Sequence, residues 1–148
     1  MSEIHLRVLK PGDETILDRV AAGVFDEPIR PELAKDYLAE PRFHIVVALD
    51  GDLVVGMATG LVYFHPDKVP EFFVNEVGVG DAYLRRGIAR RLMAALFDEA
   101  RKAGCTYAWL GTEDDNTAAN ALYRSLGGAE QKMNFFEFNL APHPGGGK

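Results

Sequence analysis

The stretch FFVNEVGVGDAYLRRGIARRLMAALFDEA, residues 72–100, joins an apolar run to an arginine-rich loop and then to an amphipathic segment. Apolar residues recur at positions 88, 92, 96 and 100, and this spacing predicts a helix over residues 87–104 that ends at Gly104. The start of a helix carries partial positive charge and favours acidic side chains by about 0.3–1 kcal/mol each. Here the charges are reversed, because the helix start gathers Arg85, Arg86, Arg90 and Arg91.

A bound anion explains this reversal. The first N–H groups of a helix have no acceptor within the helix, and Gly87 allows a ligand to approach the main chain closely. Arginines add charge-assisted hydrogen bonds to such a ligand. The alternative is a set of solvated arginines whose repulsion is screened by water, which Arg90 and Arg91 also fit because arginine favours helices. The loop contains neither the GxxxxGK[ST] nor the GxGxxG pattern.

Composition limits the class of protein. A chain of 148 residues suits one domain, for which we expect residues 1–140, followed by a disordered tail over 141–148. Its single cysteine, Cys105, excludes an internal disulfide, and its four histidines have no metal-ligand spacing. The net charge of −6 argues against a nucleic-acid binder and suits either a cationic substrate or simple solubility. We expect a cytoplasmic protein with no membrane contact and no metal.

Hydrophobic patterning predicts a mixed α/β (α+β) fold with helices covering a sheet. Strands are expected over 4–9, 43–49, 53–64, 72–79, 106–111 and 132–140, and helices over 13–25, 32–40, 87–104 and 116–128. Asp13 is the expected N-cap of the first helix, and Asp50-Gly51-Asp52 is the expected hairpin turn.

Two motifs resemble the GNAT superfamily of N-acetyltransferases. Gly87-Ile88-Ala89 matches the second half of its [QR]-x-x-G-x-[GA] signature, whereas Leu84 departs from the first position. Residues 116–127 are similar to the N-x-x-A-x-x-L-Y-x-x-x-G pattern of the family. The resemblance implies a mostly antiparallel sheet of six to seven strands with about four helices, splayed between its fourth and fifth strands. Within the superfamily, the chain resembles the short aminoglycoside 3-N-acetyltransferases.

The resemblance also implies acetyl-coenzyme A as co-substrate. The main chain of Val77, Gly78 and Val79 is expected to pair with the pantetheine arm, and Asn116 to contact it. The pyrophosphate is expected at the loop and helix start, which comprise Arg85, Arg86, Gly87, Ile88, Ala89 and Arg90.

Direct attack by an amine on the thioester requires a base, because amines are protonated near neutral pH. Glu76 is the first candidate, since a charge inside the apolar run FFVNEVGV is costly unless it is paired or functional. A salt bridge or an edge position is the alternative, and Glu113 is the rival base. The resemblance further implies that Tyr123 lies near the sulfur, where it would protonate the departing thiolate.

An aminoglycoside acceptor would need carboxylates around its ammonium groups. The candidates are Asp26, Glu27, Glu113, Asp114 and Asp115, although the last three also fit a solvated turn in which an Asp caps the next helix. Other acceptors, namely a small amine, a polyamine or a protein N-terminus, stay open, as does a non-catalytic sensor that binds coenzyme A. The aromatic last strand would suit a homodimer.

Overall fold

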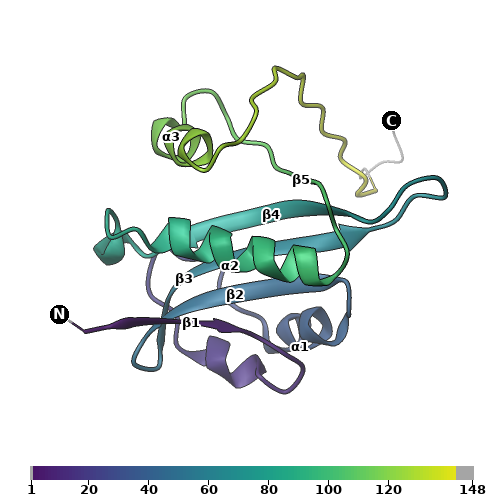
Figure 1. The fold of residues 1–148 in the computed structure, drawn as a ribbon. Helices are drawn as coiled ribbons and strands as arrows, with labels where there is room; N and C mark the ends of the chain where they lie inside the picture. Colours follow the sequence, from purple (N-terminus) through teal and green to yellow (C-terminus); the bar gives the residue numbers. More distant parts are fainter. Residues whose placement is uncertain (1, 143–148) are drawn as a thin grey trace. The chain divides into compact units, whose positions relative to one another are not determined.

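Five strands form one sheet in the order β1-β2-β3-β4-β5, with antiparallel pairs from β1 to β4 and a parallel pair between β4 and β5 (Figure 1). The computed structural model describes residues 2–142. Its elements are β1 (Ile4–Val8), the 3-10 helix η1 (Glu14–Asp18), α1 (Pro31–Ala39), β2 (Phe43–Asp50), β3 (Leu53–Tyr63), β4 (Glu71–Val79), the 3-10 helix η2 (Asp81–Tyr83), α2 (Ile88–Lys102), β5 (Ala108–Trp109) and α3 (Thr117–Ser125).

The chain divides into two compact units, Met1–Glu113 and Asp114–Lys148, and each is described by itself. The first unit holds the whole sheet together with α1 and α2. The second unit holds α3.

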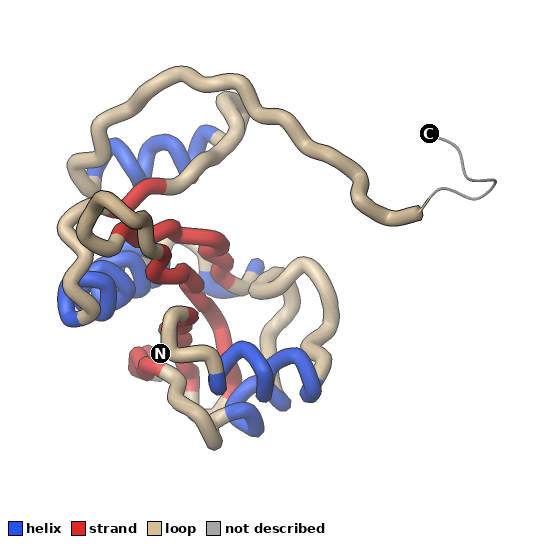
Figure 2. Tube along the Cα trace, turned by 90° about the vertical axis from the view of Figure 1, so that its right-hand side faces the viewer, coloured by secondary structure: helices blue, strands red, loops and turns tan. Residues whose placement is uncertain are grey.

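Both faces of the central strands are buried. On one face lies α2, whose Leu92 and Leu96 are fully buried. On the other face α1 and η1 contribute Leu38 and Leu17 to a second apolar cluster, so helices flank the sheet on two sides (Figure 2). Because β2 and β3 are covered on both sides, their sequences are nearly continuous apolar runs rather than alternating ones.

The mixed α/β fold expected from the sequence is confirmed, and most of its central elements lie where predicted. Asp50 pairs with Leu53, so Gly51 and Asp52 form the tight turn of the β2–β3 hairpin. Gly51 has a φ of 63°, a conformation that glycine adopts without steric cost.

The predicted helix over residues 13–25 is wrong beyond its first turn. After η1 the chain runs alongside β3 instead, where Ala21 N–H donates to the Val54 carbonyl and Val54 N–H donates to the Arg19 carbonyl. Asp13 stands at the N-cap position of η1, where its carbonyl accepts from Ile16 N–H, but its side chain makes no capping bond, because its carboxylate accepts from the Arg7 guanidinium and the Lys10 N–H. The pairing with β3 competes with helix formation and wins.

The sheet has fewer strands than the predicted six to seven, and α1, α2 and α3 are the α-helices of the described residues, rather than about four. The predicted strand over 106–111 shortens to Ala108–Trp109. Residues 132–140 form no strand, and Phe135 is 81% exposed. A strand needs a partner for its backbone groups, and none pairs with this segment among the described residues. Most of the predicted tail, from residue 143 on, lies outside the described residues.

Candidate active site

The edge of β4 that faces β5 is paired at the start of the strand and open along the rest of it. Phe72 pairs with Ala108 and Phe73 pairs with Trp109 in β5. Beyond Phe73 the described part of the chain supplies no further β5 partner, so β4 from Val74 to Val79 is paired with β3 alone. An open strand edge presents a row of main-chain donors and acceptors, which an extended ligand can bind as an added strand.

A β-bulge interrupts β4 at the start of this open edge. Glu76 lies opposite Thr59 and Val74 lies opposite Gly60, so Asn75 is the extra residue. Glu76 is exposed, and its N–H donates to the Thr59 hydroxyl oxygen at 3.1 Å. Bulges re-aim side chains and are common beside active sites. The predicted base therefore lies at an irregular point of the strand, immediately before Val77, Gly78 and Val79.

The arginine loop follows β4 directly. Arg85 and Gly87 are both left-handed, with φ values of 64° and 74°. Turns with such residues gather N–H groups into concave anion sites. Arg91 N–H makes a 3.2 Å hydrogen bond to the Gly87 carbonyl, so the N–H groups of Gly87, Ile88 and Ala89 precede this bond and belong to the helix start. The local geometry fits a pyrophosphate.

The four arginines differ in their surroundings. Arg91 donates to the Ile4 carbonyl at 3.0 Å and so joins α2 to β1. Arg86 lies over the Tyr83 ring, 5.3 Å from its centroid. Arg85 and Arg90 are exposed on the loop and on the first turn of α2.

Tyr83 links the arginine loop to the sheet. Its hydroxyl donates to the Asp50 carboxylate at 2.6 Å, and this bond, after one from Ser2, keeps the pKa of Asp50 below its usual value. Tyr83 therefore joins the loop that carries Arg86 to the end of β2.

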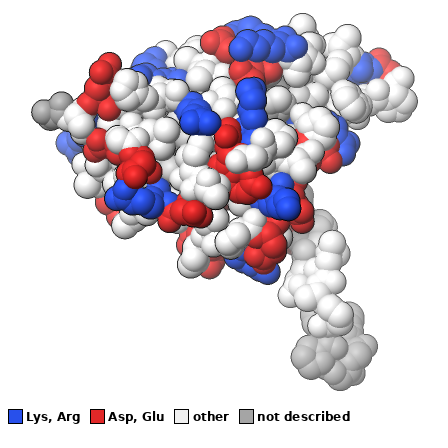
Figure 3. All heavy atoms as spheres, turned by 90° about the horizontal axis from the view of Figure 1, so that it is seen from below, with Lys and Arg blue, Asp and Glu red and all other residues white. Residues whose placement is uncertain are grey.

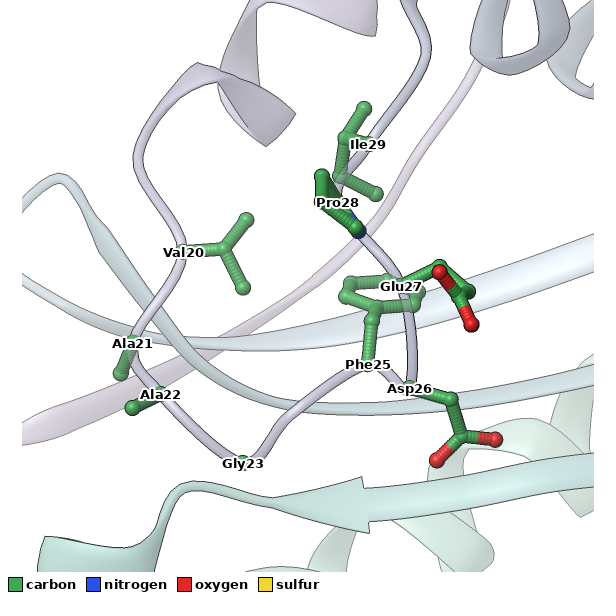
Figure 4. A pocket seen from close by; sticks show the side chains of 9 residues that line it. All are labelled: Val20, Ala21, Ala22, Gly23, Phe25, Asp26, Glu27, Pro28 and Ile29. Carbon is green, nitrogen blue, oxygen red and sulfur yellow. The ribbon is translucent and has the colours of Figure 1, made fainter.

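The loop that carries Asp26 and Glu27 lies beside the end of β4. The Val24 carbonyl packs so closely on Gly78 that a Cβ there would overlap it. The Ala22 carbonyl accepts from Asp81 N–H at 3.1 Å. Loop residues line a pocket of about 220 Å³. In Figure 4 the Val20 side chain points toward Phe25 and Pro28, whereas the side chains of Asp26 and Glu27 point away from Val20.

The remaining predicted site residues lie at or beyond the end of the first unit. Glu113 is exposed at that end. Within the second unit, Asn116 caps α3 by accepting from Ala119 N–H at 3.1 Å, and burial raises the pKa of Tyr123. Asp114 pairs with Lys132 at 3.5 Å, and the capping role considered for an Asp falls to Asn116. In the first unit the structure thus brings together Glu76, Val77–Val79, the arginine loop and Asp26-Glu27. Asn116 and Tyr123 belong to the second unit, which is described by itself.

Comparison with known proteins identifies the family. A family model described as "Acetyltransferase (GNAT) family" matches residues 14–128. The chain belongs to the GNAT acetyltransferase family. GNAT acetyltransferases use acetyl-coenzyme A. One structural neighbour, an aminoglycoside N-acetyltransferase solved with coenzyme A, is 18% identical and has a TM-score of 0.75 over 95% of this chain and 97% of that one.

Curated GNAT relatives align over part of their length. The N-alpha-acetyltransferase RimI of Mycobacterium tuberculosis is 42% identical over 104 residues, which are 70% of this chain and 63% of that protein. The ribosomal protein bS18-alanine N-acetyltransferase of Escherichia coli is 43% identical over 51 residues, 34% of each chain. The chain therefore spans less than two thirds of the length of these relatives.

A structural neighbour supports the GNAT fold alone. An aminoglycoside acetyltransferase from an uncultured soil metagenomic sample, solved with trehalose, has a TM-score of 0.79. It is 21% identical and the match covers 93% of this chain and 97% of that one.

Sequence reasoning missed three residues around this GNAT site, namely Tyr37, Thr59 and Tyr83. Thr59 gave a signal, since it is the one polar residue inside the otherwise apolar run LVVGMATGLV. Tyr37 and Tyr83 gave none, because their roles depend on contacts with distant parts of the chain.

Two features are absent from residues 2–142. Within that range no helix is long and apolar enough to span a membrane. The same range contains no group of three or more His, Cys, Asp or Glu side chains placed to hold a metal ion.

Proposed function

We propose that this GNAT protein is an acetyl-coenzyme A-dependent N-acetyltransferase. The observation that carries the proposal is the run of features along one stretch of chain. A bulge presents Glu76, an open strand edge follows it, and a left-handed arginine loop opens α2. These features offer, in order, a base, a surface for an extended arm and a site for a pyrophosphate.

The cofactor would lie along this stretch. Val77, Gly78 and Val79 would pair with the pantetheine arm through their main chain. The N–H groups of Gly87, Ile88 and Ala89, with the side chains of Arg85, Arg86 and Arg90, would hold the pyrophosphate. Of these, Arg86 is already oriented by Tyr83. Asn116 would contact the arm, in addition to capping α3.

The chemistry is a direct transfer that needs no metal ion. Glu76 accepts a proton from the acceptor ammonium, and the neutral amine attacks the thioester carbonyl. A C–N bond forms, the C–S bond breaks, and the departing thiolate takes a proton from Tyr123. The nitrogen loses its second proton, which restores the Tyr123 hydroxyl through solvent, and the proton held by Glu76 is released. Burial raises the pKa of Tyr123, so its hydroxyl is protonated near neutral pH, the form that this step requires.

For the acceptor, we propose the α-amine at a protein or peptide N-terminus. The support is the identity to proteins named N-alpha-acetyltransferase and ribosomal protein-alanine N-acetyltransferase, which is about twice the identity to the solved aminoglycoside enzymes. An α-amine has an ordinary pKa of about 7.7–8.0, so part of it is already neutral near pH 7 and it demands less of the base than a lysine amine does.

An aminoglycoside is the second candidate, with acetylation at the 3-amino group of its 2-deoxystreptamine ring. The observation that favours it is the exposure of Asp26 and Glu27 beside the end of β4, where carboxylates would replace water around ammonium groups. Glu113, Asp114 and Asp115 would add to this charge. Acidic and basic side chains are intermingled on the face seen in Figure 3, so that face offers no extended acidic field.

Release of coenzyme A thiol tests both candidates in one assay. The protein is mixed with acetyl-coenzyme A and, in separate reactions, with a peptide that begins with alanine, the same peptide with a blocked N-terminus, and a 2-deoxystreptamine aminoglycoside. We expect turnover with the free peptide alone. Turnover with the aminoglycoside alone would support the second candidate, and binding of acetyl-coenzyme A without any turnover would support a sensor.

A further inference from the structure

A buried side chain helps to hold the bulge that presents Glu76. A β-bulge leaves one residue outside the regular pairing, so its main-chain groups need other partners. Here Glu76 N–H donates to the Thr59 hydroxyl oxygen at 3.1 Å. Thr59 is 5% exposed, and it is the buried polar residue of the described core.

Tyr37 of α1 lies next to Thr59. The Thr59 side chain is close enough to the Tyr37 hydroxyl to affect its pKa, and the Tyr37 hydroxyl donates to the His44 carbonyl at 2.7 Å. Tyr37 therefore ties α1 to β2 beside the threonine that holds the bulge. The Tyr37 ring is fixed in turn by packing on Phe43, with ring centroids 5.0 Å apart.

The electrostatics agree with this geometry. Burial raises the pKa of Tyr37, and the negative charge of Glu76 raises it further. The Tyr37 hydroxyl thus stays protonated and remains a donor across the pH range in which the protein would work. The Tyr37 hydroxyl also lies near enough to the Glu76 carboxylate for that charge to act on it.

We propose that Thr59 and Tyr37 are positioning residues that fix the bulge and so aim the Glu76 carboxylate at the acceptor amine. This inference rests on the proposed function, since it gives Glu76 the role of base. The two residues do not touch the reacting atoms. They act through the Glu76 main chain, and a displacement of about 1 Å in a catalytic group costs on the order of a hundredfold in rate.

Two variants of Thr59 form a matched pair. Thr59→Val keeps the shape and removes the hydroxyl, whereas Thr59→Ser keeps the hydroxyl. We expect Thr59→Val to lower kcat by at least about tenfold and to leave the KM for acetyl-coenzyme A unchanged. Thr59→Ser retains the wild-type kcat. In a Glu76→Gln background, Thr59→Val lowers kcat no further, because the group that it aims is already absent. An equal loss in both backgrounds would overturn the proposal.

A second measurement does not depend on activity. Hydrogen exchange of the Glu76 amide, followed by NMR, should be faster in Thr59→Val by at least about tenfold and unchanged in Thr59→Ser. Unchanged exchange in Thr59→Val would overturn the positioning role even if the protein transferred no acetyl group. Should Thr59→Val fail to fold, Tyr37→Phe keeps the ring packing and removes the hydroxyl beside Thr59 and its bond to the His44 carbonyl, and the same faster exchange at Glu76 is expected of it.

Discussion

Glu76 is the residue whose replacement is most informative about chemistry. Glu76→Gln keeps the size and the polar character of an exposed side chain, so folding should be unaffected. Because the amide cannot accept the proton of the ammonium, we expect kcat to fall by at least about a hundredfold. Steady-state kinetics with acetyl-coenzyme A and the accepted amine measure this loss.

Glu113→Gln is the matched control, since Glu113 is the rival base and is also exposed. We expect it to retain most of the wild-type kcat. A large loss in Glu113→Gln together with a small one in Glu76→Gln would reverse the assignment of the base.

Among single residues, the sequence predicts the charged site residues better than it predicts the residues that hold them in position. Glu76 stands out because it is a carboxylate inside an apolar strand. Thr59 stands out less, as one hydroxyl in an apolar run, and the sequence gives no partner for it. The role of Tyr37 depends on the extra residue Asn75, which shifts the register of β4 against β3. No local sequence pattern predicts such a shift.

The loop between β4 and α2 permits a test of the proposed pyrophosphate site. Arg85→Ala removes one charge. Alanine and arginine have a similar energetic cost in the left-handed conformation of residue 85, so the loop conformation should be retained. A charge-assisted hydrogen bond contributes about 1.5–3 kcal/mol, so we expect the Kd for acetyl-coenzyme A to rise by about tenfold or more. Calorimetric titration measures it, and the difference should shrink as salt is added.

Arg101→Ala is the control on the same helix. Arg101 lies in the last turn of α2, where it pairs with Asp98 on the surface. Its loss should leave the cofactor Kd unchanged. Equal weakening by Arg85→Ala and Arg101→Ala would indicate a general effect of charge rather than a site at the helix start.

The contact between β4 and the loop of residues 20–29 predicts a second effect at the scale of elements. In Gly78→Ala the new Cβ would overlap the Val24 carbonyl, so the loop or the strand must shift. Overpacking of this kind costs about 1–3 kcal/mol, and we expect a lower urea midpoint by that amount. Gly111→Ala is the control, because a Cβ there meets nothing within 4 Å. Equal stability of the two variants would contradict the close packing.

Elements are predicted well where their own residues determine them. β2, β3 and α2 carry long apolar runs or a regular stripe, so their positions follow from the sequence. The segment 13–25 has helical spacing as well, but hydrogen bonds of Arg19 and Ala21 with Val54 in β3 hold it extended. Residues 132–140 have strand composition, and composition does not supply a pairing partner. Both differences arise from partners that are distant in the sequence.

At the scale of the whole molecule, fold and acceptor are separate questions. The fold is similar to that of aminoglycoside enzymes at about one fifth identity, and a fold at that distance does not specify a substrate. The higher identity to N-alpha-acetyltransferases concerns only part of those proteins. The acceptor therefore has to be decided by turnover.

Acetyl transfer to an alanine-starting peptide, measured with wild type and Glu76→Gln in parallel, tests the role of Glu76 most directly. Mass spectrometry should find one acetyl group on the α-amine with wild type, and about a hundredfold slower transfer with the variant. Equal rates for the two proteins, or binding of acetyl-coenzyme A with no transfer to the peptide or to an aminoglycoside, would contradict the central claim that Glu76 on the β4 bulge is the base of an N-acetyltransferase.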